Sequence, residues 1–135
     1  MHLEEYRTVA VDAVIFRDNK VLLLHRNRPP FNGCWVLPGG RVEKHETVEA
    51  AVMREAREET GLDIAIEKFL GVFSSPQRDP RGTVGIAFRC RVAGGREKPE
   101  EAEASELKWF SLNQLPKNLG FDHAEIIKAA QKAPE

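Results

Sequence analysis

Short apolar runs separated by turn residues make up the first part of the chain. The stretch 8–16 is apolar and rich in β-branched side chains, and a second apolar run follows at 20–25. Asp18 and Asn19 lie between the two runs and are typical of a turn. The pattern predicts a β-hairpin with two mostly buried strands. The polar segment 26–33 contains two prolines and a glycine, and we expect a loop there.

The apolar spacing becomes helical between residues 48 and 60. One face of this segment is formed by Val48, Ala51, Val52 and Ala56. Thr47 is a favourable N-cap, and Gly61 supplies the left-handed stop that ends many helices. We therefore expect a helix from Val48 to Thr60 whose apolar face packs on the core.

The second half of the chain is predicted to add three strands and a final helix. The strands are expected at 63–73, 83–92 and 105–110. A polar loop starts at Ala93, and a helical turn is predicted at 111–116. The final helix starts close to Phe121, where Asp122 and Glu125 form a capping pattern. Capping alone would explain the presence of Asp122.

The composition indicates one globular domain covering residues 1–135. Apolar residues make up 41% of the chain and charged residues 30%, as in ordinary soluble proteins. The net charge of −1 argues against general attraction to nucleic acid or membranes, so a charged ligand would be captured locally. The N-terminus has no signal-peptide core and no stretch reaches about 18 apolar residues, so a cytoplasmic location is expected. Cys34 and Cys90 lack metal-type spacing and receive no role.

Three glutamates gather on one face of the predicted helix. Glu55, Glu58 and Glu59 stand at i, i+3 and i+4, where like charges destabilise a helix by about 0.2–0.5 kcal/mol per pair. A divalent cation would relieve this repulsion, and carboxylate oxygens suit magnesium or manganese. The alternative is a solvated face stabilised by pairs such as Arg54 with Glu58. The glycine-rich loop before the helix favours the metal site.

A fixed spacing of glycine, glutamate and arginine extends across residues 40–62. It consists of Gly40, Glu46, Arg54, Glu55, Glu58, Glu59, Gly61 and Leu62. This pattern resembles the Nudix box of the Nudix hydrolases. Two positions depart from the family pattern, because Ala56 replaces a larger aliphatic residue and His45 stands where many members have glycine. Histidine adopts positive φ only occasionally, so His45 is expected to alter the backbone of the loop.

The resemblance implies an α/β/α sandwich with a mixed, curved sheet and a divalent-metal cofactor, Mg²⁺ with Mn²⁺ as an alternative. The metal ligands that it implies are Gly40, Glu55, Glu58 and Glu59. Glu55 or Glu58 is the candidate base, and Arg54 is expected to orient the carboxylates. Glu46 would hold the loop or reach the metal through water. Many members add a glutamate from a late loop, for which Glu103 and Glu106 are the candidates.

Shorter segments resemble the ADP-ribose pyrophosphatase branch of the family, namely Pro76 and the stretches 78–82 and 121–126. They imply a small nucleotide substrate, a nucleoside diphosphate linked to another moiety. ADP-ribose, cleaved to AMP and ribose 5-phosphate, is the first choice. The candidate substrate contacts are Arg26, Arg28, Gly39, Arg78, Arg81 and His123. The arginine fork suits phosphate, although the loop carrying Arg78 and Arg81 also reads as an ordinary surface turn.

Other functions share these features. Nucleoside triphosphates and dinucleoside polyphosphates are alternative substrates, since one box serves several substrate classes. A non-catalytic nucleotide sensor is the alternative of another class. Such regulators usually carry a DNA-binding domain or have lost box glutamates, and neither feature occurs in this sequence. Relatives with ADP-ribose specificity often pair, so the resemblance is also compatible with a homodimer.

Overall fold

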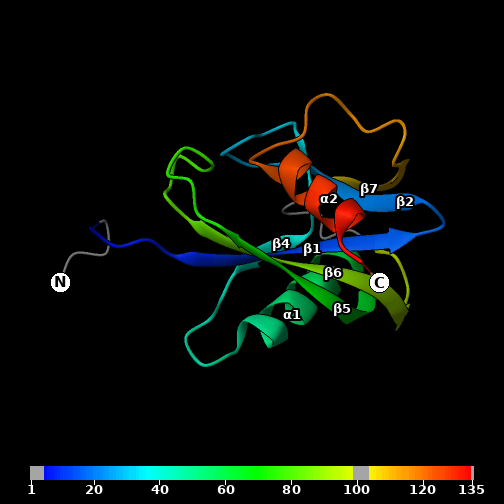
Figure 1. Ribbon diagram of the computed structural model, residues 1–135, viewed down its shortest axis with the longest axis horizontal. Helices are drawn as coiled ribbons and strands as arrows, with labels where there is room; N and C mark the ends of the chain where they lie inside the picture. The colour runs from blue at the N-terminus through cyan, green and yellow to red at the C-terminus, as the bar shows by residue number, and fades with distance from the viewer. Residues whose placement is uncertain (1–4, 99–103, 135) are drawn as a thin grey trace.

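The computed structural model describes residues 5–98 and 104–134 and consists of a mixed β-sheet between two helices (Figure 1). The strands are β1 (Val9–Arg17), β2 (Lys20–Arg26), β3 (Trp35–Val36), β4 (Gly39–Arg41), β5 (Leu62–Phe73), β6 (Val84–Gly95) and β7 (Ala104–Ser111). The helices are α1 (Val48–Thr60) and α2 (His123–Lys132). Helix α1 lies below the β1–β6–β5 part of the sheet in Figure 1, and α2 lies above it. The expected α/β/α sandwich is confirmed.

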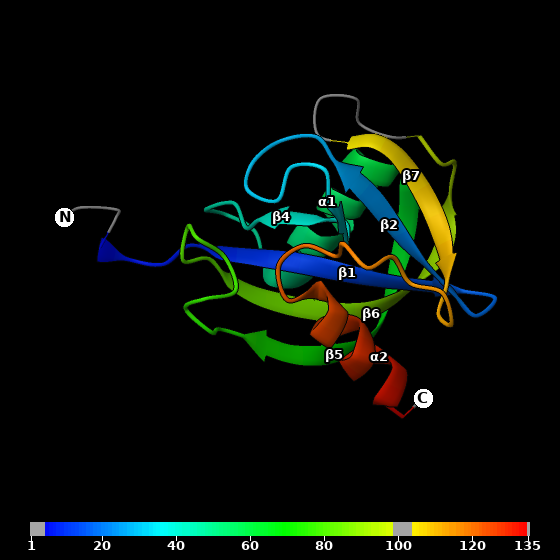
Figure 2. The same ribbon diagram turned by 90° about the horizontal axis from the view of Figure 1, so that it is seen from above.

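The sheet is mixed because one long-range pairing is parallel. Its strand order is β3-β2-β1-β6-β5, with β4 also paired to β1 and β7 to β2. Strands β1 and β6 run parallel from Val9↔Val84 to Ile15↔Cys90, whereas the other pairings are antiparallel. Figure 2 shows β1 crossing the middle of the molecule, with β2 and β7 on one side and β6 and β5 on the other. Strand β1 therefore borders both halves of the sheet.

The predicted hairpin and the predicted helix are both present. Asp18 and Asn19 have φ values of 51° and 62°, which suits the two-residue turn that joins β1 to β2. At the start of α1, the Thr47 side chain accepts a hydrogen bond from the Ala50 amide at 3.0 Å. The helix ends at Gly61, which has a φ of 79°. These local signals fix the limits of α1 at the residues expected from the sequence.

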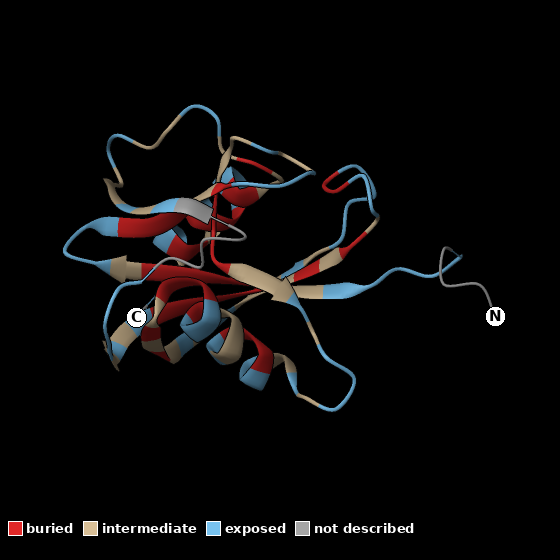
Figure 3. Cartoon of the chain, turned by 180° about the vertical axis from the view of Figure 1, so that it is seen from behind, coloured by how far each residue is buried: buried red, intermediate tan, exposed pale blue. Residues whose placement is uncertain are grey.

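Two apolar clusters hold the helices on the sheet. The cluster beneath α1 includes Val52, Ala56 and Phe88. The cluster beneath α2 includes Val14, Leu23 and Ile127. Buried residues follow the inward face of α1, while its outer face is exposed (Figure 3). In the part of the chain that the structure describes, no helix combines the length and apolarity needed to cross a membrane.

Four local predictions were wrong or incomplete. Strand β6 continues to Gly95 because Gly94 and Gly95 pair with the start of β5. The predicted helical turn at 111–116 is a simple turn, in which the Gln114 amide donates to the Ser111 carbonyl at 2.9 Å. Asp122 precedes α2 but its side chain makes no capping hydrogen bond. His45 does not have a positive φ, so the loop accommodates it in an ordinary conformation.

Candidate active site

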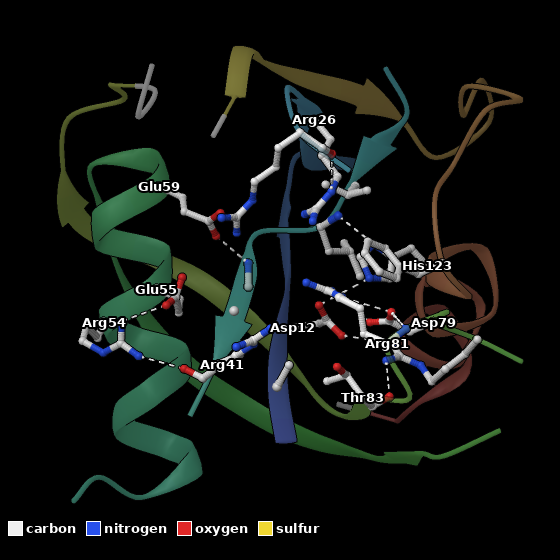
Figure 4. A pocket seen from close by; sticks show the side chains of 18 of the residues that line it. Asp12, Arg26, Arg41, Arg54, Glu55, Glu59, Asp79, Arg81, Thr83 and His123 are labelled. Atoms are coloured by element: carbon white, nitrogen blue, oxygen red, sulfur yellow. Dashed lines mark hydrogen bonds and ion pairs between the residues drawn. The ribbon is translucent and has the colours of Figure 1, made fainter. Parts of the chain in front are cut away.

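A cavity of about 470 Å³ lies between α1 and a wall that includes residues of the 78–83 loop and the start of α2. Residues of β1, β4 and α1 line it, together with residues from the 26–37 stretch. Figure 4 shows Glu55 and Glu59 approaching it from α1, and Asp79, Arg81 and His123 from the opposite side. Carboxylates of α1 therefore lie across the cavity from Arg81 and His123.

Arg54 joins the carboxylates of the 40–62 segment. Its Nε and Nη2 donate to both oxygens of Glu46, and its Nη1 donates to Glu55 at 2.7 Å and to Glu58 at 3.2 Å. Nη2 also donates to the Arg41 carbonyl at 3.0 Å, which ties the loop to the helix. The bonds from Arg54 and from the Glu43 amide lower the pKa of Glu46 to about 2. The same carboxylates raise the pKa of Arg54, chiefly through Glu46, so the cluster stays charged near neutral pH.

The two glycines of β4 bring the backbone against the carboxylates of α1. A Cβ atom on Gly40 would stand 2.5 Å from the carboxyl carbon of Glu55, so any side chain there collides with that glutamate. The Gly39 amide donates to Oε1 of Glu59 at 2.6 Å, and Glu59 is only 5% exposed. The requirement for glycine at 39 and 40 thus comes from close approach rather than from a turn.

Three glutamates of α1 accept hydrogen bonds from other groups: Glu55 and Glu58 from Arg54, and Glu59 from the Gly39 amide. Glu58 is half exposed, while Glu55 and Glu59 face the cavity. Among the described residues, no three His, Cys, Asp or Glu side chains are close enough together to hold a metal ion as they stand. The oxygen donors are nevertheless of the kind that magnesium and manganese prefer, and the Gly40 backbone lies directly against Glu55.

Arg81 lines the cavity opposite α1, and its guanidinium is held by the buried carboxylate of Asp79. Asp79 is 1% exposed and accepts from Nε and Nη2 of Arg81 at 3.1 and 2.9 Å. Although burial opposes the ionisation of Asp79, the hydrogen bonds from Arg81 hold its pKa below the ordinary value. The guanidinium of Arg81 lies 5.9 Å from the centre of the Phe121 ring. The loop thus presents a fixed cation to the cavity.

Arg78 is directed into the protein instead. Its Nε and Nη2 donate to both oxygens of Asp122, at 2.9 and 2.8 Å, and Nη1 donates to the Thr83 carbonyl. Burial works against the charge of Arg78, but Asp122 and the nearby Asp12 outweigh it and raise its pKa. Asp122 is therefore the partner of Arg78, which corrects its interpretation as a helix cap. The sequence predicted Arg78 as a substrate contact and did not indicate its bonds to Asp122 and Thr83.

Arg26 and Arg28 also line the cavity. Arg26 is 9% exposed, and its Nε donates to the carbonyls of Arg28 and Pro30 at 3.1 and 2.5 Å. Its guanidinium lies 5.3 Å from the centre of the Phe121 ring. Arg28 follows it on an exposed part of the loop. Arg26 thus shapes the loop from which Arg28 projects.

Asp12 is a residue of this cavity that the sequence reasoning missed. It is 7% exposed on β1, where Oδ1 lies 3.3 Å from Nε2 of His123 and Oδ2 lies 3.6 Å from Nη2 of Arg78. The other ring nitrogen of His123, Nδ1, accepts a hydrogen bond from the Leu37 amide at 2.9 Å. The available signal was a lone acid inside an apolar strand, since a buried carboxylate needs a partner.

The family model for the NUDIX domain matches residues 6–130 of this chain. The chain belongs to the Nudix family. A relative, the ADP-ribose pyrophosphatase of Methanocaldococcus jannaschii, is 52% identical over 132 residues, which cover 93% of this Nudix chain and 77% of the relative. Together with the family match, this similarity identifies the chain as a Nudix hydrolase.

Two solved Nudix structures share the fold. The NUDIX domain of NrtR from Shewanella oneidensis, solved with ADP ribose, is 32% identical with a TM-score of 0.80, and the match covers 94% of this chain and 88% of that one. A bifunctional NMN adenylyltransferase/ADP ribose pyrophosphatase from Francisella tularensis, solved with AMP and a manganese ion, is 26% identical with a TM-score of 0.77. That match covers 94% of this chain and 42% of the other.

The structure brings most of the predicted Nudix residues to one cavity. The cavity is lined by Gly39, Gly40, Arg54, Glu55, Glu59, Arg26, Arg28, Arg78, Arg81 and His123. Glu46 is joined to this set through Arg54. Glu106 lies on β7 opposite His25 and is not among the described residues that line the cavity. Glu103 lies outside the described residues.

Proposed function

We propose that this Nudix hydrolase cleaves ADP-ribose to AMP and ribose 5-phosphate with the help of a divalent metal ion. The observation that carries the proposal is a cavity lined both by carboxylates of α1 and by Arg28 and Arg81. A pyrophosphate needs cationic groups around it, and a divalent metal ion would add positive charge beside the carboxylates that Arg54 only partly offsets. The 52% identical ADP-ribose pyrophosphatase and the ADP-ribose-bound structure support this choice of substrate.

The residues that would hold the metal are Glu55, Glu58, Glu59 and the Gly40 carbonyl. The manganese-containing neighbour supports a divalent ion, and we propose Mg²⁺ with Mn²⁺ as an alternative. When bound, the metal supplies a water of lowered pKa and offsets charge that develops on the phosphate oxygens. Arg54 keeps Glu55 and Glu58 close together, so two of these ligands are positioned in advance. A carboxylate oxygen of Glu55 or Glu58 would accept the proton of the attacking water.

The substrate would be held by arginines that line the cavity. Arg81 is fixed by Asp79, so its fork needs little ordering before it meets a phosphate or a ribose hydroxyl. Arg28 would reach the substrate from the opposite loop. Arg26, Gly39, Arg78 and His123 also line the cavity and would form the rest of its wall. The homodimer stays a prediction, which analytical ultracentrifugation would test. The cytoplasmic location also stays a prediction.

The experiment that tests the proposed function is product identification after incubation with ADP-ribose and magnesium. Anion-exchange chromatography should show AMP and ribose 5-phosphate, and chelation of the metal or the Glu58→Gln substitution should abolish most of the product. Release of AMP that survives chelation would overturn the metal assignment. Tight binding of ADP-ribose without any product would favour the non-catalytic nucleotide sensor over the enzyme.

A further inference from the structure

We propose that His123 is a positioning residue, which holds the Gly39–Gly40 backbone against the glutamates of α1 through its hydrogen bond to Leu37. The proposal rests on the proposed function only for its kinetic readout. The residues concerned belong to distant parts of the chain, because His123 is the first residue of α2 while Leu37 lies two residues before β4. The contact links the last helix to the loop in front of α1.

The segment from Leu37 to Gly39 is held at each residue. The Leu37 amide donates to Nδ1 of His123 at 2.9 Å, and the Pro38 carbonyl accepts from the Ala13 amide at 2.8 Å. The Gly39 amide then donates to Glu59 at 2.6 Å. The contact at Leu37 is the only one of these three that comes from a side chain of the C-terminal helix. Losing it would free one end of the segment that carries the Glu59 contact.

This backbone has no room for adjustment on its β1 side. A Cβ atom on Gly39 would overlap the Val11 carbonyl and stand 2.7 Å from Oδ1 of Asp12. The segment is therefore pressed between β1 and α1, and a shift at Leu37 is transmitted to Gly39 rather than absorbed. Misplacement of a catalytic group by about 1 Å costs on the order of 10²-fold in rate.

The ring of His123 is itself held from the opposite side. Because Nδ1 accepts from the Leu37 amide, the proton of the neutral ring lies on Nε2, which faces Oδ1 of Asp12 at 3.3 Å. Asp12 and Asp122 flank Arg78, and Asp122 directly precedes His123. His123 is 3% exposed, and Phe121 stacks on its ring with centroids 5.0 Å apart. The ring orientation is thus fixed before any substrate binds.

Two amide variants separate the functions of the two ring nitrogens. In His123→Asn the side-chain oxygen replaces Nδ1, so the acceptor for the Leu37 amide is kept and the contact with Asp12 is lost. In His123→Gln the side-chain amide reaches toward Asp12 in the place of Nε2, and the acceptor for Leu37 is lost. A general structural role would make the two variants equally impaired, whereas positioning through Leu37 distinguishes them.

The first measurement is steady-state turnover of ADP-ribose. We expect His123→Gln to lower kcat by about 10- to 100-fold with a smaller change in KM, and His123→Asn to recover most of that kcat. A loss that appears in KM alone would overturn the proposal, because it would mean direct substrate contact. Equal kcat values for the two variants would overturn it as well.

The second measurement needs no activity. Amide hydrogen exchange at Gly39, followed by NMR, should be faster by about tenfold or more in His123→Gln and close to the parent rate in His123→Asn. Equal protection of Gly39 in both variants would overturn the positioning proposal even if ADP-ribose is the substrate. If His123→Gln does not fold, the imidazole ¹⁵N correlations of the parent protein decide, because a protonated Nδ1 would exclude the bond to Leu37. Absence of AMP release by the parent would instead refute the proposed function alone.

Discussion

Arg54 grips Glu46 with two parallel hydrogen bonds, from Nε at 2.9 Å and from Nη2 at 2.6 Å. This bidentate pair joins the loop before α1 to the middle of the helix. The remaining guanidinium nitrogen, Nη1, is left for Glu55 and Glu58. Glu46 therefore acts on the site by fixing the arginine that organises the other carboxylates.

The first prediction concerns the pH dependence of this pair. The folded pKa of Glu46 is lowered from 4.5 to about 2, so its contribution to stability is present above pH 4.5 and is lost as the pH falls toward 2. Arg54→Gln removes the main cause of the shift. The difference in unfolding temperature between the parent and Arg54→Gln should therefore shrink between pH 4.5 and 2. A difference that stays constant down to pH 2 would refute the pairing.

The second prediction concerns the charge of the site glutamates. Glu58→Gln and Glu59→Gln should each lower kcat by at least about 10²-fold, because an amide keeps the shape but loses a charged catalytic group. The amide oxygen at position 59 can still accept from Gly39, so both variants should fold. Glu49→Gln, on the first turn of the same helix and exposed, is the matched control. Near-normal turnover with either site variant would refute the assignment of that glutamate to the catalytic site.

The third prediction concerns close backbone approach at Gly40. An alanine there places its Cβ 2.5 Å from the Glu55 carboxyl carbon, so Gly40→Ala should push that carboxylate away and reduce turnover strongly. Gly94→Ala is the control, since its Cβ would meet only Asp63 at 3.7 Å. Kinetic assays of both variants, with circular dichroism to confirm folding, make the comparison. Equal activity in the two alanine variants would contradict the close-approach argument.

The fourth prediction concerns the buried ion pair of Arg78. Arg78→Met would leave Asp12 and Asp122 without their cation, which should cost about 3–5 kcal/mol in the free energy of unfolding. Arg57→Met breaks the exposed pair with Asp63 and should cost less than about 1 kcal/mol. Urea denaturation of the two variants gives both values. A small effect at Arg78 would mean that its main partner is the substrate, as the sequence suggested.

The elements that the sequence predicted well are those with local signals. Helix α1 was placed correctly because Thr47 and Gly61 mark its ends within its own segment. Strand β6 was cut short because its last residues are glycines, which become strand only through pairing with β5. Propensity contains no information on that partner.

Among the site residues, too, those with local signals were predicted and those with long-range partners were not. The glutamates of α1 were predicted because their spacing along one helix is visible in the chain, whereas Asp12 was missed because its partners lie on loops and a helix far away in sequence. Asp122 was read as a cap for the same reason, since Arg78, which binds it, is 44 residues away. Long-range ion pairs between buried groups are the part of this site that local patterns do not reveal.

The cavity is proposed to select a nucleoside diphosphate linked to a sugar. A competition assay tests it most directly, with ADP-ribose, NADH, a diadenosine polyphosphate, GTP and 8-oxo-dGTP at equal concentration in one reaction with magnesium. The relative rates of disappearance give the ratios of kcat/KM. We expect ADP-ribose to be consumed first, with AMP and ribose 5-phosphate as products. Faster consumption of either triphosphate would contradict it and would leave only the Nudix assignment in place.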